Sequence, residues 1–490
     1  MRRAILPVAA VALYGLLLIP DRARAPRANP NRQPFNWNRD ARWDELEQRF
    51  NQARALGCAR IALPTDRALQ RGQTFVAMMG ARHLSPTAPV YDTIETNLFE
   101  LATMVGACRG RLPDYIRLVF ETREAVKRES WLWDMNAAAT RDRLYELLYG
   151  SRAALEEVML QGAQDSVPSL LLGDEEQSHT PAAIVLGVTI HSGDFLVSRA
   201  GDAVSSLIAV GSDHPGVFSH VAVAYVDPKT SLAYVIESNS DRGVEIHNLE
   251  QYLQEVKLRV LVLRLRADLP ALVADPMLPH EAATRILANA RRRHIPYNFD
   301  LSEHGQQRLY CSQVLSSMLD EFHITLWSDM SSISNPGVTA WLAALGVANF
   351  EPEEPSDLEY NPQLRIVAEW RDPETLYSDH LDNVVTEALL NGAERGDRLD
   401  YSWYLLPLAR VVKAYSAVMN LVGGVGPIPE GMSTTIGLRL LRYRWAHAAI
   451  KQRVIEGAAR FRQRRGYNAP EWELLRFARQ AKAELRPRGP

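Results

Sequence analysis

The chain has 490 residues, of which 47% are hydrophobic and 23% charged, with 28 glycines and 28 prolines. These proportions are those of a folded globular protein and exclude the disordered, collagen-like and coiled-coil classes. The formal net charge of −3, from 55 basic and 58 acidic residues, indicates no nucleic-acid partner. At about 100–200 residues per domain, the length predicts two to four domains.

Residues 1–25 have the composition of an export segment. A basic start, Met1-Arg2-Arg3, precedes the almost wholly apolar residues 4–19, and Ala23-Arg24-Ala25 offers a cleavage site. The apolar run is shorter than the roughly 20 residues that a membrane-spanning helix needs. Pro26 disfavours cleavage directly before it, so a cleaved signal peptide and an uncleaved anchor to the inner membrane both stay open. Either predicts the periplasm or exported cell envelope.

Residues 26–182 predict an α-helical N-terminal domain. From Trp43 to Gln161 the apolar residues recur at helical spacing, with few β-branched runs. Residues 162–182 are mainly polar around a short apolar patch, which favours a hinge. No motif in this domain indicates a chemical reaction.

Residues 183–373 change to a strand-like pattern. Short β-rich runs alternate with turn residues, and Asp227-Pro228-Lys229-Thr230 is a good turn between two of these runs. Helices are expected at residues 280–293 and from Cys311 to residue 323. The sequence therefore predicts an α+β fold, with an antiparallel sheet packed against the Cys311 helix.

Residues 374–490 predict a helical, basic C-terminal region. From Leu438 to Pro490 there are fourteen Lys and Arg residues and four acidic ones. The predicted apolar stripe of this helix consists of Leu438, Leu441, Trp445 and Ala449. Such a helix either lies on an anionic membrane surface or packs on its own domain with a solvated basic face, and we expect the second.

Residues 403–422 are hydrophobic enough to suggest a membrane segment. Pro407, Arg410 and Lys413 interrupt this stretch and favour a buried helix instead.

The three cysteines give an odd count. In an oxidising compartment at least one thiol stays free. Either Cys58 and Cys108 form a disulfide and Cys311 is free, or all three are buried thiols. The sequence does not decide between these arrangements.

Cys311 begins a predicted helix whose apolar face includes Val314, Leu315 and Met318. A thiol at a helix N-terminus meets unpaired backbone N–H groups and the positive end of the helix dipole, which favour the nucleophilic thiolate. A cysteine in this position is, by itself, more often inert.

His220 and Glu237 lie on neighbouring predicted strands. His220 shares a face with the small residues Ala222 and Ala224, and a hairpin would bring Glu237 beside the imidazole. A carboxylate there fixes the tautomer and stabilises the imidazolium, which stabilises a thiolate in turn. Each residue alone has a structural explanation, as a sheet histidine or a strand-end charge; the combination with Cys311 predicts a cysteine hydrolase.

Four motifs occur in chain order: Gly193-Asp194-Phe195-Leu196, Ser219-His220-Val221, Val235-Ile236-Glu237-Ser238 and Tyr310-Cys311-Ser312-Gln313. With them, the sequence resembles the permuted papain-like amidases of the YiiX type, in the NlpC-like cysteine peptidase superfamily. The resemblance covers about residues 189–370. It implies His220 as general base, Glu237 as its orienting acid and Cys311 as nucleophile.

Two further segments resemble the family, and the sequence departs from it at one pair of residues and in the approach to His220, residues 211–217, which is longer than in the family. Residues 296–300 look like the segment upstream of the cysteine, and residues 355–362 like the closing segment. Ala222-Val223 stands where the family usually has glycine and a branched apolar residue. These departures concern the shape of the cleft more than the catalytic residues.

The leading hypothesis is a cell-envelope cysteine hydrolase that cleaves an amide through an acyl-enzyme. By resemblance, its partner is a peptidoglycan stem peptide or a related small amide. The Cys311 N–H is an expected oxyanion donor, and Tyr310, Ser219 and Tyr297 are candidate pocket residues.

Two alternatives stay open, and other chemistries have no support. The same fold could act as a lipid acyltransferase or esterase, which the basic C-terminal helices and an anionic membrane would suit. It could also be a scaffold that binds without turnover. Zinc, dinucleotide, Walker and serine-hydrolase motifs are absent from the sequence, so we expect no metal, no cofactor and no nucleic acid.

Overall fold

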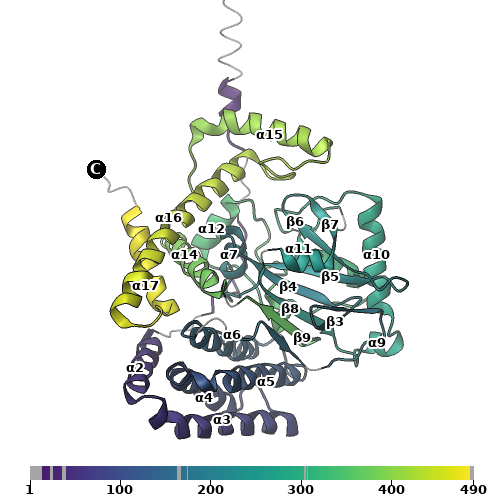
Figure 1. Cartoon of the computed structure of the whole chain (residues 1–490). Helices are drawn as coiled ribbons and strands as arrows, with labels where there is room; N and C mark the ends of the chain where they lie inside the picture. The colour runs from purple at the N-terminus through teal and green to yellow at the C-terminus, as the bar shows by residue number, and fades with distance from the viewer. Residues whose placement is uncertain are drawn as a thin grey trace, which may run out of the picture.

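The computed structural model describes residues 14–21, 26–35, 40–162, 167–173, 175–255, 257–302, 305, 307–372 and 374–485. A central sheet lies between helices from both ends of the chain (Figure 1). The N-terminal helices cover one end of the sheet, and the C-terminal helices run along one side of the molecule. This arrangement confirms the predicted α+β class.

The main sheet has seven strands in the order β1-β9-β8-β4-β5-β6-β7, and every neighbouring pair is antiparallel. The strands are β1 (Leu170–Leu172), β4 (Phe195–Ala200), β5 (His220–Val226), β6 (Ala233–Asn239), β7 (Gly243–Asn248), β8 (Lys257–Leu265) and β9 (Leu364–Arg371). A second, two-stranded sheet pairs β2 (Ala182–Val185) with β3 (Val188–His191). The apolar patch of the expected hinge forms β1, which pairs with β9 at the sheet edge.

The middle strands are buried on both faces, which explains their nearly continuous apolar runs. One face packs on α10 (Leu278–Arg292) and α11 (Cys311–Asp320). The other face packs on α8 (Leu249–Gln254) and β3. Smaller helices complete this region: α7 (Ala203–Val210), α9 (Pro270–Ala274), α12 (Pro336–Ala344) and α13 (Asp357–Tyr360).

The hairpin of β5 and β6 forms as the sequence predicts. The Asp227 carboxylate accepts hydrogen bonds from the N–H groups of Lys229 (2.9 Å) and Thr230 (3.0 Å), which closes the turn. In the resulting register, Ala222 lies opposite Glu237. The functional residues of both strands therefore lie at the same end of the hairpin.

The N-terminal helices pack around their own apolar core. They are α2 (Asp40–Leu56), α3 (Cys58–Ala81), α4 (Val90–Ala107), α5 (Leu112–Ser130) and α6 (Ala138–Leu160). A disulfide joins Cys58 to Cys108, and Cys311 is a free, buried thiol.

Buried ion pairs connect these helices to the sheet. Arg152 of α6 donates to Glu369 of β9 at 2.6 Å and to Glu359 of α13 at 2.7 Å. Arg259 of β8 pairs with Glu156 of α6 and, at 2.6 Å, with Asp379 of α14. These side chains are at most 4% exposed. The N-terminal helices, the sheet and the first C-terminal helix therefore share one ionic core.

The C-terminal helices are α14 (Leu376–Glu394), α15 (Leu406–Leu421), α16 (Thr434–Arg465) and α17 (Glu471–Leu485). Helices α14, α16 and α17 enclose a core of their own. The expected apolar stripe of α16 is wrong, because Leu441 and Trp445 are 60% and 54% exposed. The helix instead buries the face that carries Tyr443, His447 and Ile450.

The expectation that residues 403–422 form a buried helix is also wrong. Helix α15 projects from the body (Figure 1), and its buried residues are Leu406, Ala409 and Ser416. Five of its large apolar side chains, Leu408, Val411, Tyr415, Val418 and Leu421, are exposed because the body contacts only one side of the helix. Among the described residues, no helix has the length and apolar character needed to cross a membrane.

Candidate active site

Cys311 is the first residue of α11 and is 4% exposed. Tyr310 precedes it with extended backbone, and the Gln313 side-chain oxygen accepts hydrogen bonds from the Tyr310 N–H (3.2 Å) and from Asn298 (3.0 Å). N–H groups in the first turn of a helix have no partner within the helix. The start of α11 is thus held rigidly, with the thiol at its positive end.

The segment upstream of the cysteine ties α11 to the sheet. Leu309 N–H donates to the Pro296 carbonyl (3.1 Å), and Asn298 N–H donates to the Leu309 carbonyl (3.3 Å). The hydroxyl of Ser238, next to Glu237 on β6, also donates to the Leu309 carbonyl, at 2.6 Å. The sheet strand that carries Glu237 is therefore bonded directly to the residue two positions before Cys311.

His220 brings the three predicted residues together. Its Nε2 hydrogen-bonds to Glu237, and the Cys311 side chain lies within hydrogen-bonding reach of the imidazole. Burial alone would lower the pKa of His220, but the Glu237 carboxylate and the Cys311 side chain raise it to about 9. Burial would raise the pKa of Glu237, whereas His220 lowers it. At neutral pH this pair is an imidazolium and a carboxylate.

A second imidazole, which the sequence analysis missed, lies on the other side of the same carboxylate. His247 Nε2 of β7 is 3.4 Å from Glu237 Oε1 and 3.7 Å from Glu245. Glu245 lies directly opposite Glu237 in the sheet. The alternation Glu245-x-His247 is the sequence signal for this face, and it is weak within a strand of six largely polar residues.

The three candidate pocket residues differ in their positions. Tyr297 is close enough to Cys311 for a negative charge on the sulfur to raise the pKa of its phenol, a second effect after burial. The Tyr310 hydroxyl accepts a hydrogen bond from the Glu353 N–H at 3.2 Å. The Ser219 hydroxyl bonds to Ser205. A negative charge on Cys311 also contributes to raising the pKa of the Tyr310 phenol, after burial and the effect of Glu353, so both tyrosines lie near the cysteine.

Two of the recognised motifs have structural tasks. Asp194 accepts hydrogen bonds from Arg264 at 2.7 and 2.8 Å and from the His191 N–H at 2.7 Å, which fixes the turn into β4. Ser356, in the closing segment, bonds to both backbone groups of Phe218 at 3.2 Å. That segment therefore holds the strand entry two residues before His220.

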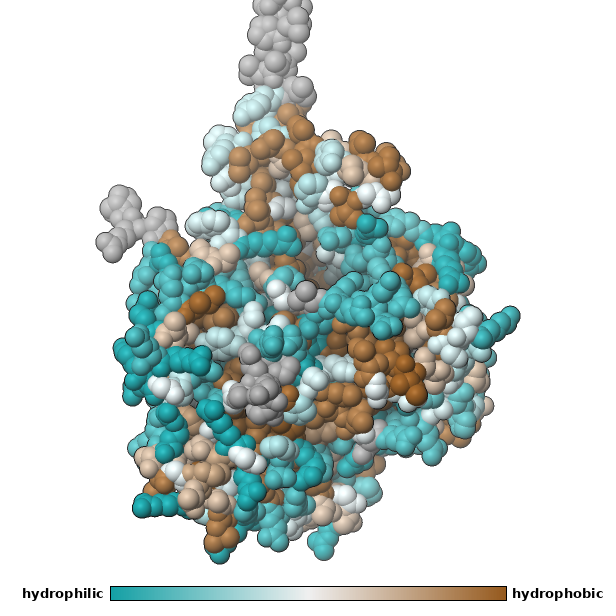
Figure 2. Space-filling view, viewed as in Figure 1, coloured by the Kyte–Doolittle hydropathy of each residue, from teal (hydrophilic) through white to brown (hydrophobic). Residues whose placement is uncertain are grey.

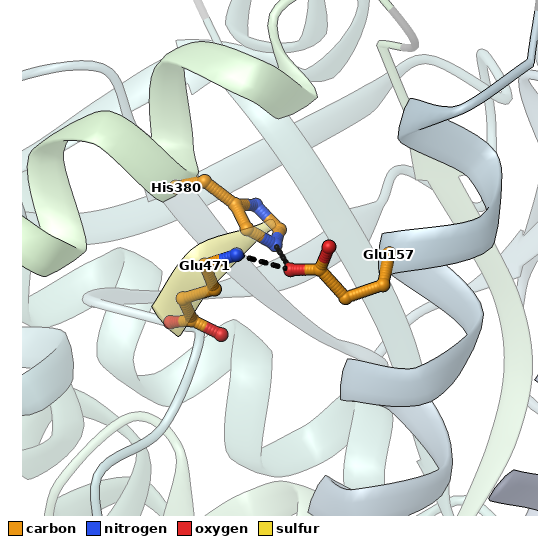
Figure 3. Close-up of side chains that lie close together, drawn as sticks. All are labelled: Glu157, His380 and Glu471. Atoms are coloured by element: carbon orange, nitrogen blue, oxygen red, sulfur yellow. Dashed lines mark hydrogen bonds and ion pairs between the residues drawn. The ribbon is translucent and has the colours of Figure 1, made fainter. Parts of the chain in front are cut away.

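One group of side chains has the composition of a metal site, outside the Cys311 region. Glu157, His380 and Glu471 offer ligand atoms within 4.8 Å of one another. Figure 3 shows that the Glu157 carboxylate already accepts from the Glu471 backbone N–H (2.9 Å) and faces His380 Nε2 (3.5 Å), while the Glu471 carboxylate points away. These contacts describe a buried ion pair at the start of α17, which raises the pKa of His380 to about 10 against the effect of burial.

Comparisons with known proteins cover the sheet region. Residues 189–367 match the model of the permuted papain-like amidase enzymes, YaeF/YiiX, family C92. The crystal structure of the metalloprotein YiiX from Escherichia coli O157:H7 is similar to 36% of this chain and 95% of that chain, with 19% sequence identity and a TM-score of 0.28. No curated protein matches. The family match confirms the resemblance that the four motifs predict, and the helices outside residues 189–367 lie beyond it.

Proposed function

We propose that this protein is a cysteine hydrolase that cleaves an amide bond, with Cys311 as nucleophile, His220 as general acid and base, and Glu237 as the group that orients His220. The observation that supports this most directly is the His220 imidazole between the Glu237 carboxylate and the thiol. The match to a family of permuted papain-like amidases supports the reaction class.

In the acylation step, the Cys311 sulfur attacks the carbonyl carbon of the amide. A C–S bond forms, and the carbonyl electron pair moves onto oxygen, where N–H groups at the start of α11 stabilise the charge. When the tetrahedral intermediate collapses, the C–N bond breaks and the imidazolium of His220 gives its proton to the leaving amine. The products of this step are a free amine and a thioester on Cys311.

In the deacylation step, neutral His220 removes a proton from water, and the hydroxide attacks the thioester carbonyl. The C–S bond breaks, which releases a carboxylic acid and restores the thiolate–imidazolium pair. Glu237 stays ionised throughout and holds the imidazole in place.

As substrate class we propose peptidoglycan stem peptides or related small amides in the cell envelope. The basic start and apolar residues 4–19 support export. The Cys58–Cys108 disulfide supports an oxidising compartment, because such bonds rarely persist in the cytosol.

A second candidate is hydrolysis or transfer of a lipid acyl group by the same cysteine. It is favoured by the position of the exposed helix α15, because the loop that follows it contacts the active-site side of the sheet. Glu430 pairs with His294 at 2.9 Å, and Gly431 lies beside Phe299 and Tyr297.

The first test measures alkylation of Cys311 by iodoacetamide at pH 6, using peptide mass spectrometry. We expect the hydrogen bond from His220 to make the Cys311 sulfur more reactive, so that His220→Ala slows alkylation at least about tenfold. His83→Ala is the matched control, since this exposed histidine lies 3.9 Å from Glu129 in the N-terminal helical region, and it should leave the rate unchanged. Equal rates in wild type and His220→Ala would contradict the proposed function.

The second test separates the two substrate classes. Wild type and Cys311→Ala are incubated with purified peptidoglycan and, separately, with phospholipid vesicles, and the products are analysed by mass spectrometry. New amine and carboxyl termini that require Cys311 support the amidase, whereas released fatty acid supports the lipid reaction. If neither substrate changes although Cys311 is reactive, both substrate classes are wrong.

A further inference from the structure

Exposed apolar side chains are concentrated at one end of the molecule. Among the described residues, fourteen of the twenty-four exposed large apolar side chains belong to residues 14–19 and 403–445. Figure 2 shows this concentration as brown surface over α15, at the top of the molecule. Such a patch on a soluble protein generally marks a contact with another molecule or a membrane.

One side of helix α15 forms the centre of this apolar patch. Its exposed face consists of Leu408, Val411, Tyr415, Val418 and Val422, the last of which directly follows the helix. These residues recur every three or four positions and therefore share one face. Their exposed fractions lie between 55% and 74%. The opposite side contacts the body, so α15 is amphipathic with its apolar side outward.

The N-terminal apolar segment joins the body beside this face. The guanidinium of Arg410, on α15, donates to the carbonyl oxygens of Leu16 (3.3 Å) and Ile19. Asp21 and Thr435 exchange two hydrogen bonds, at 3.1 and 3.0 Å. Residues 14–21, with the exposed apolar side chains of Tyr14, Leu16 and Ile19, therefore meet the exposed face of α15 at the same end of the molecule.

The charge around the face is mainly positive. Residues 401–455 include seven Lys and Arg residues but a single acidic residue, Glu430. Arg442 and Arg444 are exposed on α16, and the exposed Trp403 and Tyr404 lie just before α15. Tryptophan and tyrosine favour the boundary between lipid and water, and basic residues are attracted to anionic headgroups.

We propose that the exposed face of α15 binds the surface of a bilayer that contains anionic phospholipids, next to the N-terminal apolar segment. The helix lies in the plane of the headgroups, with its apolar side chains in the acyl boundary and its basic neighbours at the phosphates. This inference goes beyond the proposed hydrolysis and does not depend on it.

The bound orientation brings the Cys311 region close to the membrane. Glu430 and Gly431, in the loop after α15, contact the segment that contains His294, Tyr297 and Phe299. This segment pairs through Tyr297 with Leu309, two residues before Cys311.

The test is vesicle flotation of the full-length chain. Vesicles of phosphatidylcholine with phosphatidylglycerol are compared with vesicles of phosphatidylcholine alone. The variant carries Leu408→Glu, Val411→Glu and Val418→Glu together, and the control is Ile184→Glu, an even more exposed apolar position (79%) on β2. We expect wild type and control to float with the anionic vesicles, and the triple variant to lose at least about tenfold in partitioning.

Circular dichroism and a thermal melt check that the triple variant is folded, and Cys311→Ala, which removes the proposed nucleophile, should float like wild type. If the triple variant floats as well as wild type, the N-terminal segment alone carries the binding and the proposal for α15 is wrong. Equal flotation on both vesicle types would overturn the role of anionic lipid. If wild type is instead a dimer in lipid-free solution that the triple variant turns into a monomer, a second copy covers this face, and the proposal also fails.

Discussion

The hydrogen bond between His220 and Glu237 determines which imidazole nitrogen is available to the cysteine. Because Nε2 bonds to the carboxylate, Nδ1 is left for the sulfur. In the proposed reaction, the neutral histidine therefore carries its proton on Nε2, and the proton taken from Cys311 or from water goes to Nδ1. In that reaction Glu237 acts through His220 and is a positioning residue.

The raised pKa of His220 predicts a pH-dependent contribution to stability. Protonated His220 stabilises the folded state fully below pH 6.5, and this contribution is lost as pH rises through about 9. We expect the difference in unfolding free energy between wild type and His220→Gln to shrink by about 3 kcal/mol from pH 6 to pH 9.5. Urea denaturation at a series of pH values measures it; a constant difference would contradict the assigned ion pair.

Glu237→Gln tests the positioning role. The amide cannot stabilise the imidazolium, so we expect alkylation of Cys311 at pH 6 to slow at least about tenfold while the protein stays folded. His247→Ala is the matched comparison, because His247 contacts the other oxygen of the same carboxylate at 3.4 Å and is partly exposed. It should change the rate less than about fivefold. The reverse order would assign the orienting role to His247.

Among single residues, His220 and Glu237 were predicted from strand alternation, and Cys311 was predicted from its position at the start of a helix. His247 could not be identified from the sequence. Its strand, β7, has six residues and a largely polar pattern, which is too weak to predict a strand. The contacts of Ser219 could not be predicted either, because its partner Ser205 comes from α7, an element without a clear sequence signal.

Among the elements, the turn from β3 into β4 depends on one glycine. Gly193 has a φ of 93°, and an added Cβ would lie 2.4 Å from the Cβ of Pro279. We expect Gly193→Ala to lower the unfolding free energy by at least about 2 kcal/mol. Gly80→Ala is the control, since Gly80 lies in α3 with open space around it and should gain about 0.5–1 kcal/mol. Chemical denaturation compares them, and equal effects would contradict this account.

The disulfide between α3 and the end of α4 should stabilise the N-terminal helices. It closes a loop with a sequence separation of 50 residues. We expect the paired substitution Cys58→Ser and Cys108→Ser to lower the unfolding free energy by roughly 2–5 kcal/mol. Peptide mapping without reductant checks the bond itself, and finding both cysteines as free thiols in the native protein would contradict it.

The C-terminal helices show what apolar spacing cannot predict. In α16 the stripe of Leu441 and Trp445 satisfied the helical period, yet the helix buries its other face, where Gly457 packs against Phe477 of α17. Small residues at a helix contact carry little hydrophobic signal. In α15 the composition indicated burial, but no other described element covers its outer face.

In the whole molecule, the buried ion pairs make the helices and the sheet one unit. We expect Arg152→Met to lower the unfolding free energy by about 3–5 kcal/mol, because Glu359 and Glu369 lose a buried partner. Arg117→Met removes the exposed pair with Asp114 and should cost less than about 1 kcal/mol. Denaturation followed by circular dichroism and by tryptophan fluorescence measures both, and an equally small effect of Arg152→Met would show that the buried pairs contribute little.

The α+β class and the resemblance of the sheet region to the permuted papain-like amidases were accessible from the sequence, because both depend on local patterns in residues 189–370. The ionic core was not, because its partners come from α6, β8, β9, α13 and α14, and each charge looks like a surface residue in its own segment. Only the packed structure shows that Arg152 is 2% exposed.

The order of synthesis determines when this ionic core can form. Arg152 meets its carboxylates 207 and 217 residues later in the chain. At about 5–20 residues per second, these partners emerge from the ribosome roughly 10–40 s after the arginine. Until then, the charged face of α5 and α6 stays in contact with water. The helices in the first third of the chain can complete their packing only when the last third has been synthesised. The native fold is therefore completed late, only after translation has passed β9.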